Sequence, residues 1–179
     1  MPSVGHVVVG LAAARGYAVD GASRRAVTAT FVALSAFPDL DVAARCLGAA
    51  AGSEWLHRGA LHSLAAAAAA GIAAALAVGG LGRPRWAMAA AGALVAASHG
   101  LLDTLTGGGA GVMLLWPASA ARLIAWRLMP AAPIGVRIFS PRGAGVVLGE
   151  LLRFAPLLVY ALWPARRGGD PGRTRVLPS

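Results

Sequence analysis

The sequence predicts an all-α fold, an integral membrane helical bundle of about four to five helical segments with a metal site near one membrane face. Hydrophobic residues make up 58% and charged residues 13% of the 179-residue chain. Ordinary soluble domains are about half apolar and about a quarter charged. Mean hydropathy is +0.67. Several of the few ionisable residues lie inside apolar segments, where they are costly and typical of a functional site.

Apolar runs separated by arginines predict the helices. The clearest span covers residues 64–82, nineteen residues without a charge, close to the roughly 20 needed to cross a bilayer. An Arg-Pro-Arg sequence ends this run, and a second run over 86–105 completes a helical hairpin. A third span over 143–163 contains Glu150 and Arg153. These two are three residues apart, a spacing that can pair them on one helix face.

The remaining segments carry weaker patterns. Residues 4–19 and 26–38 are short apolar runs, which we interpret as two packed helices. Residues 112–142 mix tryptophans, arginines and prolines and are expected to form an amphipathic stretch at the membrane interface. We therefore expect one membrane-embedded domain over 1–164. The Arg, Gly and Pro-rich tail over 165–179 is expected to be disordered.

The basic composition does not indicate a nucleic-acid partner. The net charge is +9, and all 16 basic residues are arginines. They are scattered, several in pairs, between apolar runs rather than gathered on a face with interleaved aromatics. Arginines that flank membrane spans explain this pattern better. Cys46 is the single cysteine, so no internal disulfide is expected. The N-terminus lacks the basic region of a cleavable signal peptide.

The candidate site residues fall in four places along the chain. They are His6, then Asp39 and Asp41 in FPDLD, then His57, Arg58 and His62 in HRGALHS, and finally His99 and Asp103 in SHGLLD. Imidazoles and carboxylates without a thiolate pair suit a hydrolytic zinc or manganese centre.

The predicted hairpin brings the later members of this set together. His62 opens its first helix, and His99 and Asp103 close its second. At about 1.5 Å per residue the two helices rise about 27 Å and 26 Å, so the three side chains reach nearly the same depth. His99 and Asp103 are four residues apart and share a helix face.

The lengths of the two upstream helices place His6, Asp39 and Asp41 at the same membrane face. The arginine pairs at 24–25, 83/85 and 166–167 then lie at the opposite face. The positive-inside rule then makes the ligand side extracytoplasmic. Further arginines on the ligand side, Arg58 and Arg122 among them, weaken this charge bias.

The motifs FPDLD, HRGALHS and SHGLLDTLT, in this order after an early histidine, resemble the YdjM-type family of LexA-regulated inner-membrane proteins. The resemblance covers roughly residues 1–160. It implies a multi-pass inner-membrane protein that acts as a metal-dependent hydrolase. It also implies a distant relation to the helical zinc-dependent phospholipase C and P1-type nucleases. Those enzymes carry a further H-x3-E pair, whereas no histidine follows His99 here. We therefore expect about one or two metal ions, zinc foremost, rather than three.

The resemblance also implies roles for the candidate residues. The metal ligands would be His6, Asp41, His62, His99 and Asp103. Either Asp39 or Asp41 could supply the upstream carboxylate; Asp39 or His57 would serve as general base or acid, and Arg58 would balance phosphate charge. The implied partners are the lipid bilayer and a phospholipid or other phosphoester substrate.

Three rival interpretations remain open. The protein could be an intramembrane metal or proton carrier, with histidines and aspartates along its path. The histidines could instead bind haem as a bis-imidazole pair. The polar cluster could also be a purely structural network that joins the helices.

Overall fold

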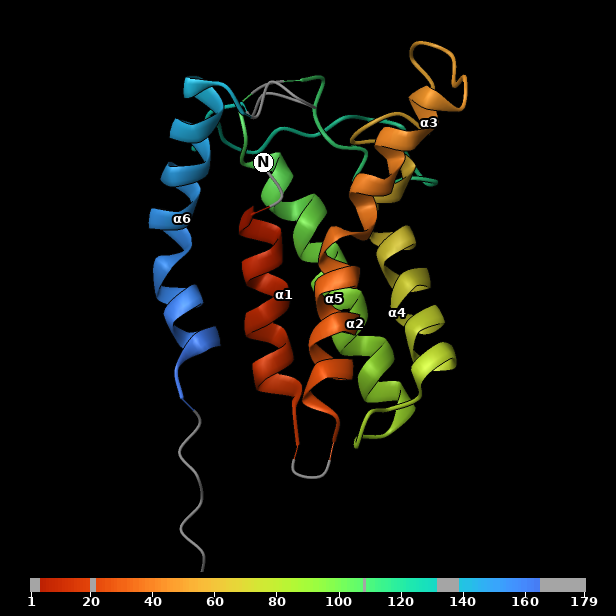
Figure 1. Cartoon of the computed structure of the whole chain (residues 1–179). Coiled ribbons are helices and arrows are strands. Elements are labelled where there is room, and N and C mark those ends of the chain that lie inside the picture. The colour runs from red at the N-terminus through yellow and green to blue at the C-terminus, as the bar shows by residue number, and fades with distance from the viewer. Residues whose placement is uncertain (1–3, 20–21, 108, 132–138, 165–179) are drawn as a thin grey trace, which may run out of the picture.

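The computed structural model describes residues 4–19, 22–107, 109–131 and 139–164, and in these ranges the chain is an all-α bundle (Figure 1). The predicted tail over 165–179 lies outside the described residues. Five long helices run along one axis: α1 (Val4–Tyr17), α2 (Arg24–Ala36), α4 (Leu64–Val78), α5 (Arg85–Thr104) and α6 (Pro141–Leu162). Three short helical segments lie at one end: η1 (Phe37–Asp41), α3 (Val42–Cys46) and η2 (Ala60–His62). The predicted fold class is confirmed.

The predicted hairpin is formed by α4 and α5, which lie in close contact. A Cβ added at Gly71 of α4 would collide with the backbone of α5, and one at Gly92 would lie 3.2 Å from the Cα of Gly71. Small residues allow this close approach of two helices. Helix α4 is shorter than the apolar run that predicted it. It ends at Val78, because Gly79 adopts φ +66°, outside the helical region.

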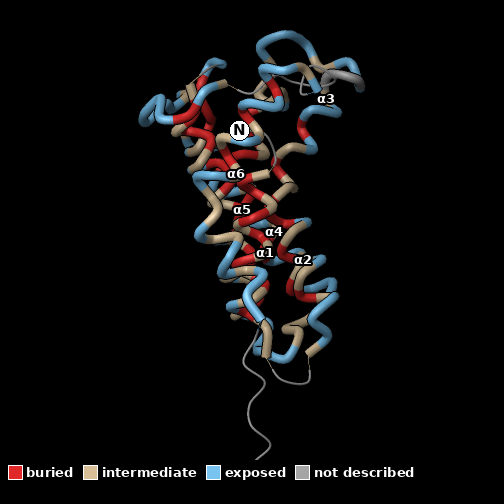
Figure 2. Tube along the Cα trace, turned by 60° about the vertical axis from the view of Figure 1, so that its left-hand side comes forward, coloured by how far each residue is buried: buried red, intermediate tan, exposed pale blue. Residues whose placement is uncertain are grey.

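Two segments are long and apolar enough to cross a membrane, judged by length and composition within the described residues. They are Arg24–Ala44, in which α2 continues through η1 into α3, and Pro141–Leu162, which is α6. Helix α6 packs on α1 at the edge of the bundle (Figure 1). Only 11% of its most apolar window is buried. Buried residues concentrate between the helices, while outward faces are exposed (Figure 2).

The apolar core lies in the middle of the bundle and toward the end where α5 begins. It is built on Tyr17, Phe31, Met88 and Val95 from three different helices, and Met88 is completely buried. The Tyr17 and Phe31 rings pack with centroids 5.0 Å apart. Because this core joins α1, α2 and α5, it holds in register the three helices that reach the candidate site.

The chain after α5 crosses the far end of the bundle as irregular structure (Figure 1). The stretch over 112–142, expected to be amphipathic and interfacial, contains no helix over 112–131, and its last two residues begin α6. Its place at a membrane interface stays a prediction. The Val112 and Leu123 backbones pair through N···O distances of 3.0 and 2.8 Å. The N–H of Leu128 donates to the carbonyl of Leu105 at 2.9 Å. These bonds tie the segment to the end of α5, so it covers the site end of the bundle. Residues 132–138 lie outside the described ranges.

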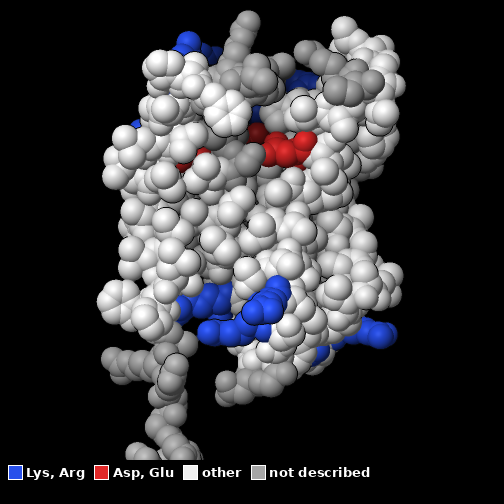
Figure 3. Space-filling model, viewed as in Figure 1, with Lys and Arg blue, Asp and Glu red and all other residues white. Residues whose placement is uncertain are grey.

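Charged side chains separate to the two ends of the molecule. Figure 3 shows a band of arginines around one end, acidic groups together with further arginines near the other, and an uncharged surface between them. The arginine end is where α2 and α5 begin, at Arg24 and Arg85, and where Arg83 donates to the carbonyl of Tyr17. This agrees with the separation expected from the sequence for these residues.

Candidate metal centre

The eight predicted site residues come together at the end of the bundle opposite this arginine end. They come from α1 (His6), η1 (Asp39 and Asp41), the loop before η2 (His57 and Arg58), η2 (His62) and α5 (His99 and Asp103). Segments almost a hundred residues apart in the chain therefore converge on one small volume.

Local sequence explains how η1 presents its two aspartates. Pro38 at the start of η1 is compatible with a first turn but not with the interior of a continuing α-helix. The chain tightens into a 3₁₀ helix over Phe37–Asp41. With three residues per turn, Asp39 and Asp41 point in different directions. Asp41 is buried, whereas the Asp39 side chain remains 25% exposed.

His99 has a defined tautomer in this arrangement. Its Nδ1 lies 2.7 Å from the carbonyl of Ser35, which can only accept a hydrogen bond, so Nδ1 carries the proton. The lone pair is therefore on Nε2, which lies 3.4 Å from Asp39 Oδ1. Histidines that bind metals commonly hold their other ring nitrogen to a carbonyl in this way. His6 stacks on His99, with ring centroids 3.5 Å apart.

Asp103 lies at the centre of the cluster. Its Oδ1 is 3.5 Å from His6 Nε2, and its Oδ2 is 3.7 Å from His62 Nε2 and 3.2 Å from Arg58 Nε. The side chain is 1% exposed. A buried carboxylate must be paired to be tolerated, and here two histidines and one arginine surround it.

Asp41 contacts a different set of groups. Its Oδ1 lies 3.0 Å from His57 Nδ1, and its Oδ2 accepts the Arg58 backbone N–H at 3.0 Å. The same Oδ2 lies 3.0 Å from His62 Nδ1. Asp41 thus joins η1 to the 57–62 segment and orients two imidazole rings.

Several buried ring nitrogens have no hydrogen-bond partner among the described residues. They are Nδ1 and Nε2 of His6, Nδ1 and Nε2 of His62, and Nε2 of His99. Carboxylate oxygens lie 3.0–3.7 Å from four of them, but without hydrogen-bond geometry. Native proteins rarely leave buried polar groups unsatisfied. A cation between the nitrogens and the carboxylates would satisfy both.

Two groups of possible ligands meet this requirement. The first is His6, His99 and Asp103, all buried, and the second is Asp39, His57 and His62; within each, one ligand atom per residue lies within 4.8 Å of the others. Burial lowers the pKa of His62 and so favours the neutral ring, the form that binds metals. The residues present therefore fit a divalent metal.

The guanidinium of Arg58 contacts protein groups and is not exposed for binding a phosphate. It is 8% exposed, its Nε faces Asp103, and its Nη2 donates to Thr106 Oγ1. Its backbone adopts φ +68°, a conformation that non-glycine residues rarely occupy and that clusters at functional sites. Its carbonyl accepts from the Met113 N–H at 3.0 Å, which ties it to the covering segment.

The centre is open at one rim. The His57 and Asp39 side chains are 32% and 25% exposed, whereas those of Asp41, His62 and Asp103 are at most 1% exposed. A molecule arriving from outside therefore meets His57 and Asp39 before it meets the buried residues.

Sequence reasoning missed Ser35 and Gly100, which shape the site, and did not identify the partner of Glu150. Ser35 fixes the His99 tautomer through its backbone, which leaves no signal in residue type. Gly100 allows α5 to approach η2, because a Cβ there would collide with the carbonyl of His62. The spacing of Glu150 and Arg153 could have paired them on one face of α6. Instead, the buried Oε2 of Glu150 accepts from the Gly5 N–H at 3.2 Å, at the start of α1, while Arg153 donates to the carbonyl of Gly149.

The fold and the site together define a class: a helical membrane protein with a candidate centre of histidines and aspartates near one end. The YdjM inner membrane protein family matches residues 1–167, and the chain belongs to this family. The chain is also similar to inner membrane protein YbcI of Escherichia coli (strain K12). The two are 35% identical over 150 residues, covering 76% of this chain and 82% of the relative. No solved structure matches significantly. The family resemblance inferred from the motifs is confirmed, and with it a membrane location.

Proposed function

We propose that this protein is a membrane-bound, divalent-metal-dependent hydrolase, with zinc as the foremost candidate ion and a phosphoester, such as a phospholipid, as substrate. The observation that carries the proposal is the set of five buried ring nitrogens without hydrogen bonds, four of which lie 3.0–3.7 Å from carboxylate oxygens. Such groups cost free energy unless something binds them. The mixture of imidazole and carboxylate is that of hydrolytic zinc sites.

His6, His62, His99 and Asp103 would hold the ion, and the geometry favours Asp39 as the additional carboxylate. Asp39 Oδ1 faces His99 Nε2, whereas Asp41 is occupied by His57 and the Arg58 N–H. This assignment exchanges the roles that the resemblance implied for the two aspartates. A divalent ion bound there supplies a Lewis acid that polarises a phosphoryl oxygen and makes water more acidic.

His57 is suited to move a proton at the rim. If its Nδ1 donates to Asp41, at 3.0 Å, its Nε2 is left to accept or release a proton. A carboxylate that orients an imidazole in this way is a recurrent arrangement in hydrolases. Arg58 would act through Asp103, whose negative charge it balances, rather than by binding phosphate directly.

The rival functions fit the geometry less well. A carrier needs polar groups through the depth of the membrane, whereas the core below the described cluster is apolar. A haem between two axial imidazoles would need its macrocycle between their rings, but His6 and His99 are stacked with centroids only 3.5 Å apart.

For the membrane arrangement, we propose several spans, with the metal centre on the extracytoplasmic side. The arginines at the starts of α2 and α5 support this orientation through the positive-inside rule. At the opposite end, Arg58 and Arg122 are engaged with Asp103, Thr106 and backbone carbonyls, which accounts for part of the charge found there.

Elemental analysis of the detergent-purified protein tests the metal centre. We expect about one or two divalent ions per chain, lost in both His62→Ala and Asp103→Asn. Glu54→Gln is the matched control, because Glu54 accepts from Trp116 Nε1 outside the centre. Metal-free wild type, even after incubation with zinc or manganese, would overturn the proposal. Metal-loaded protein that cleaves no phosphodiester or phospholipid would reject the hydrolase activity alone.

The two aspartates can be distinguished by their asparagine variants. Asp39→Asn removes the charge of a proposed ligand, so the affinity for the metal should fall by more than in Asp41→Asn, or the ion should be lost. Asp41→Asn removes an orienting group, for which losses of about 10–100-fold in metal affinity are typical. Competition with a chromogenic chelator measures both affinities. Equal effects of the two substitutions would contradict the exchanged roles.

A further inference from the structure

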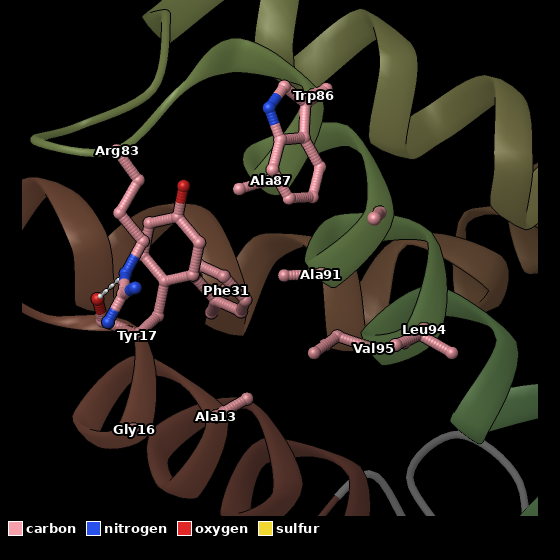
Figure 4. A pocket seen from close by; sticks show the side chains of 11 residues that line it. Ala13, Gly16, Tyr17, Phe31, Arg83, Trp86, Ala87, Ala91, Leu94 and Val95 are labelled. Carbon is pink, nitrogen blue, oxygen red and sulfur yellow. Dashed lines mark hydrogen bonds between the residues drawn. The ribbon is translucent and has the colours of Figure 1, made fainter.

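A second candidate site lies at the arginine end, away from the metal centre. It is a groove of about 500 Å³ between α1 and α5, with Phe31 of α2 at its floor (Figure 4). Its walls are small and apolar, with Ala13 on α1 and Ala87 and Ala91 on α5. Arg83 and Trp86 lie at the end where α5 begins. None of these residues belongs to the metal centre.

The dimensions of the groove suit one lipid chain. Its lining residues on α5 run from Trp86 to Val95, which at about 1.5 Å per residue is about 14 Å. The hydrocarbon core of a bilayer is about 30 Å thick, so this length is close to one leaflet. The volume lies within the range of about 300–1,000 Å³ that is typical of ligand sites.

The mouth of the groove carries a preorganised positive group. Arg83 Nε donates to the carbonyl of Tyr17 at 2.9 Å, and its guanidinium carbon lies 5.2 Å from the centre of the Tyr17 ring. Its Nη atoms make no hydrogen bond within the described part of the chain. These two contacts hold the planar guanidinium in place, and its geometry suits a phosphate.

Other residues strengthen this charge and mark the interface. Trp86, 73% exposed, is of a type enriched at membrane–water interfaces. Further arginines lie at this end: Arg24 and Arg25 at the start of α2 and Arg85 at the start of α5. The apolar groove therefore ends at a net positive mouth, which complements a negatively charged headgroup.

We propose that this groove binds an anionic phospholipid from the leaflet at the arginine end. One acyl chain lies between α1 and α5, and the headgroup phosphate binds Arg83. The inference does not depend on the metal centre or on hydrolase activity. The bound lipid would be a resident ligand, held at the end of the molecule opposite the candidate catalytic residues.

Native mass spectrometry of the full detergent-purified chain tests this proposal. The protein is titrated with phosphatidylglycerol and, in parallel, with phosphatidylcholine of the same acyl chains. Arg83→Gln removes the proposed phosphate contact, and Arg25→Gln is the matched control, an exposed arginine at the same end outside the groove. Ala90→Leu fills the groove, and Ala73→Leu adds the same bulk to an exposed position on α4.

We expect phosphatidylglycerol to bind wild type more tightly than phosphatidylcholine. Arg83→Gln should weaken it roughly tenfold, about the effect of one lost charge-assisted hydrogen bond. Ala90→Leu should weaken it by a similar factor, because the larger side chain occupies the space of the acyl chain. Both controls should stay within about twofold, and inorganic phosphate should not displace the lipid. Equal losses in Arg83→Gln and Arg25→Gln, or no loss in Ala90→Leu, would overturn the site. Displacement by inorganic phosphate would overturn the lipid as its ligand.

Discussion

The two halves of this bundle are built from the same helices but have opposite interiors. Helix α1 contributes His6 at one end and Tyr17 at the other, and α5 contributes Met88 near its start and His99 near its end. Around Met88 the interior is filled by apolar side chains. Around His99 it holds imidazoles and carboxylates, and five buried ring nitrogens of His6, His62 and His99 have no hydrogen-bond partner among the described residues. One half is therefore packed in a way that provides stability, whereas the other leaves buried polar groups that the proposed metal would satisfy.

The largest expected effect on stability comes from the apolar half. Met88→Ala removes a completely buried side chain and should lower the free energy of unfolding by about 2–5 kcal/mol. Metal content should stay unchanged in the fraction that remains folded, because Met88 lies outside the metal centre. Thermal unfolding in detergent, combined with elemental analysis, measures both. Loss of metal from folded Met88→Ala protein would break the division between the two halves.

A substitution at the site end should have a smaller effect on stability but should reduce metal affinity. Gly100→Ala adds one methyl group where α5 approaches the carbonyl of His62. Overpacking of this kind costs about 1–3 kcal/mol, and the forced shift between α5 and η2 should reduce metal affinity with every ligand still present. Gly145→Ala on α6 is the matched control, since its Cβ would meet nothing within 4 Å. Unchanged metal affinity in Gly100→Ala would show that the centre tolerates movement of η2.

The smallest effect compares two equivalent helix caps. The Ser63 hydroxyl accepts from the Ala66 N–H at the start of α4, beside the site, and the Ser23 hydroxyl accepts from the Ala26 N–H at the arginine end. Replacing either serine by alanine should cost about 1 kcal/mol. Only Ser63→Ala should also weaken metal binding, because Ser63 follows His62 directly. Calorimetric unfolding and chelator competition on both variants test this difference, and equal metal affinity in the two would contradict it.

The boundary between two helices was predicted correctly where charged residues and a proline mark the same position in the chain. The Arg-Pro-Arg sequence at 83–85 divides two apolar runs, and α5 begins within it. The length of α4 was overestimated, because an uncharged run does not reveal that Gly79 leaves the helical conformation. The sequence did not reveal how the segment after α5 is held, because its backbone bonds join Val112 to Leu123 and Leu128 to Leu105, residues that are not neighbours in the chain.

The sequence by itself determined the fold class, the membrane location and the set of residues that form the candidate centre. Composition and apolar runs indicate the fold class and the membrane location. The residues of the candidate centre can be recognised because histidines and aspartates among apolar residues cost free energy and are therefore rare there. Only the tertiary structure decided how these groups pair: Asp103 with His6 and Arg58, Asp41 with His57, and Asp39 with His99. The physical reason is that these contacts join residues 16 to 97 positions apart in the chain. Their distances depend on how closely α5 approaches η2 and on the 3₁₀ turn at η1, and local residue patterns specify neither.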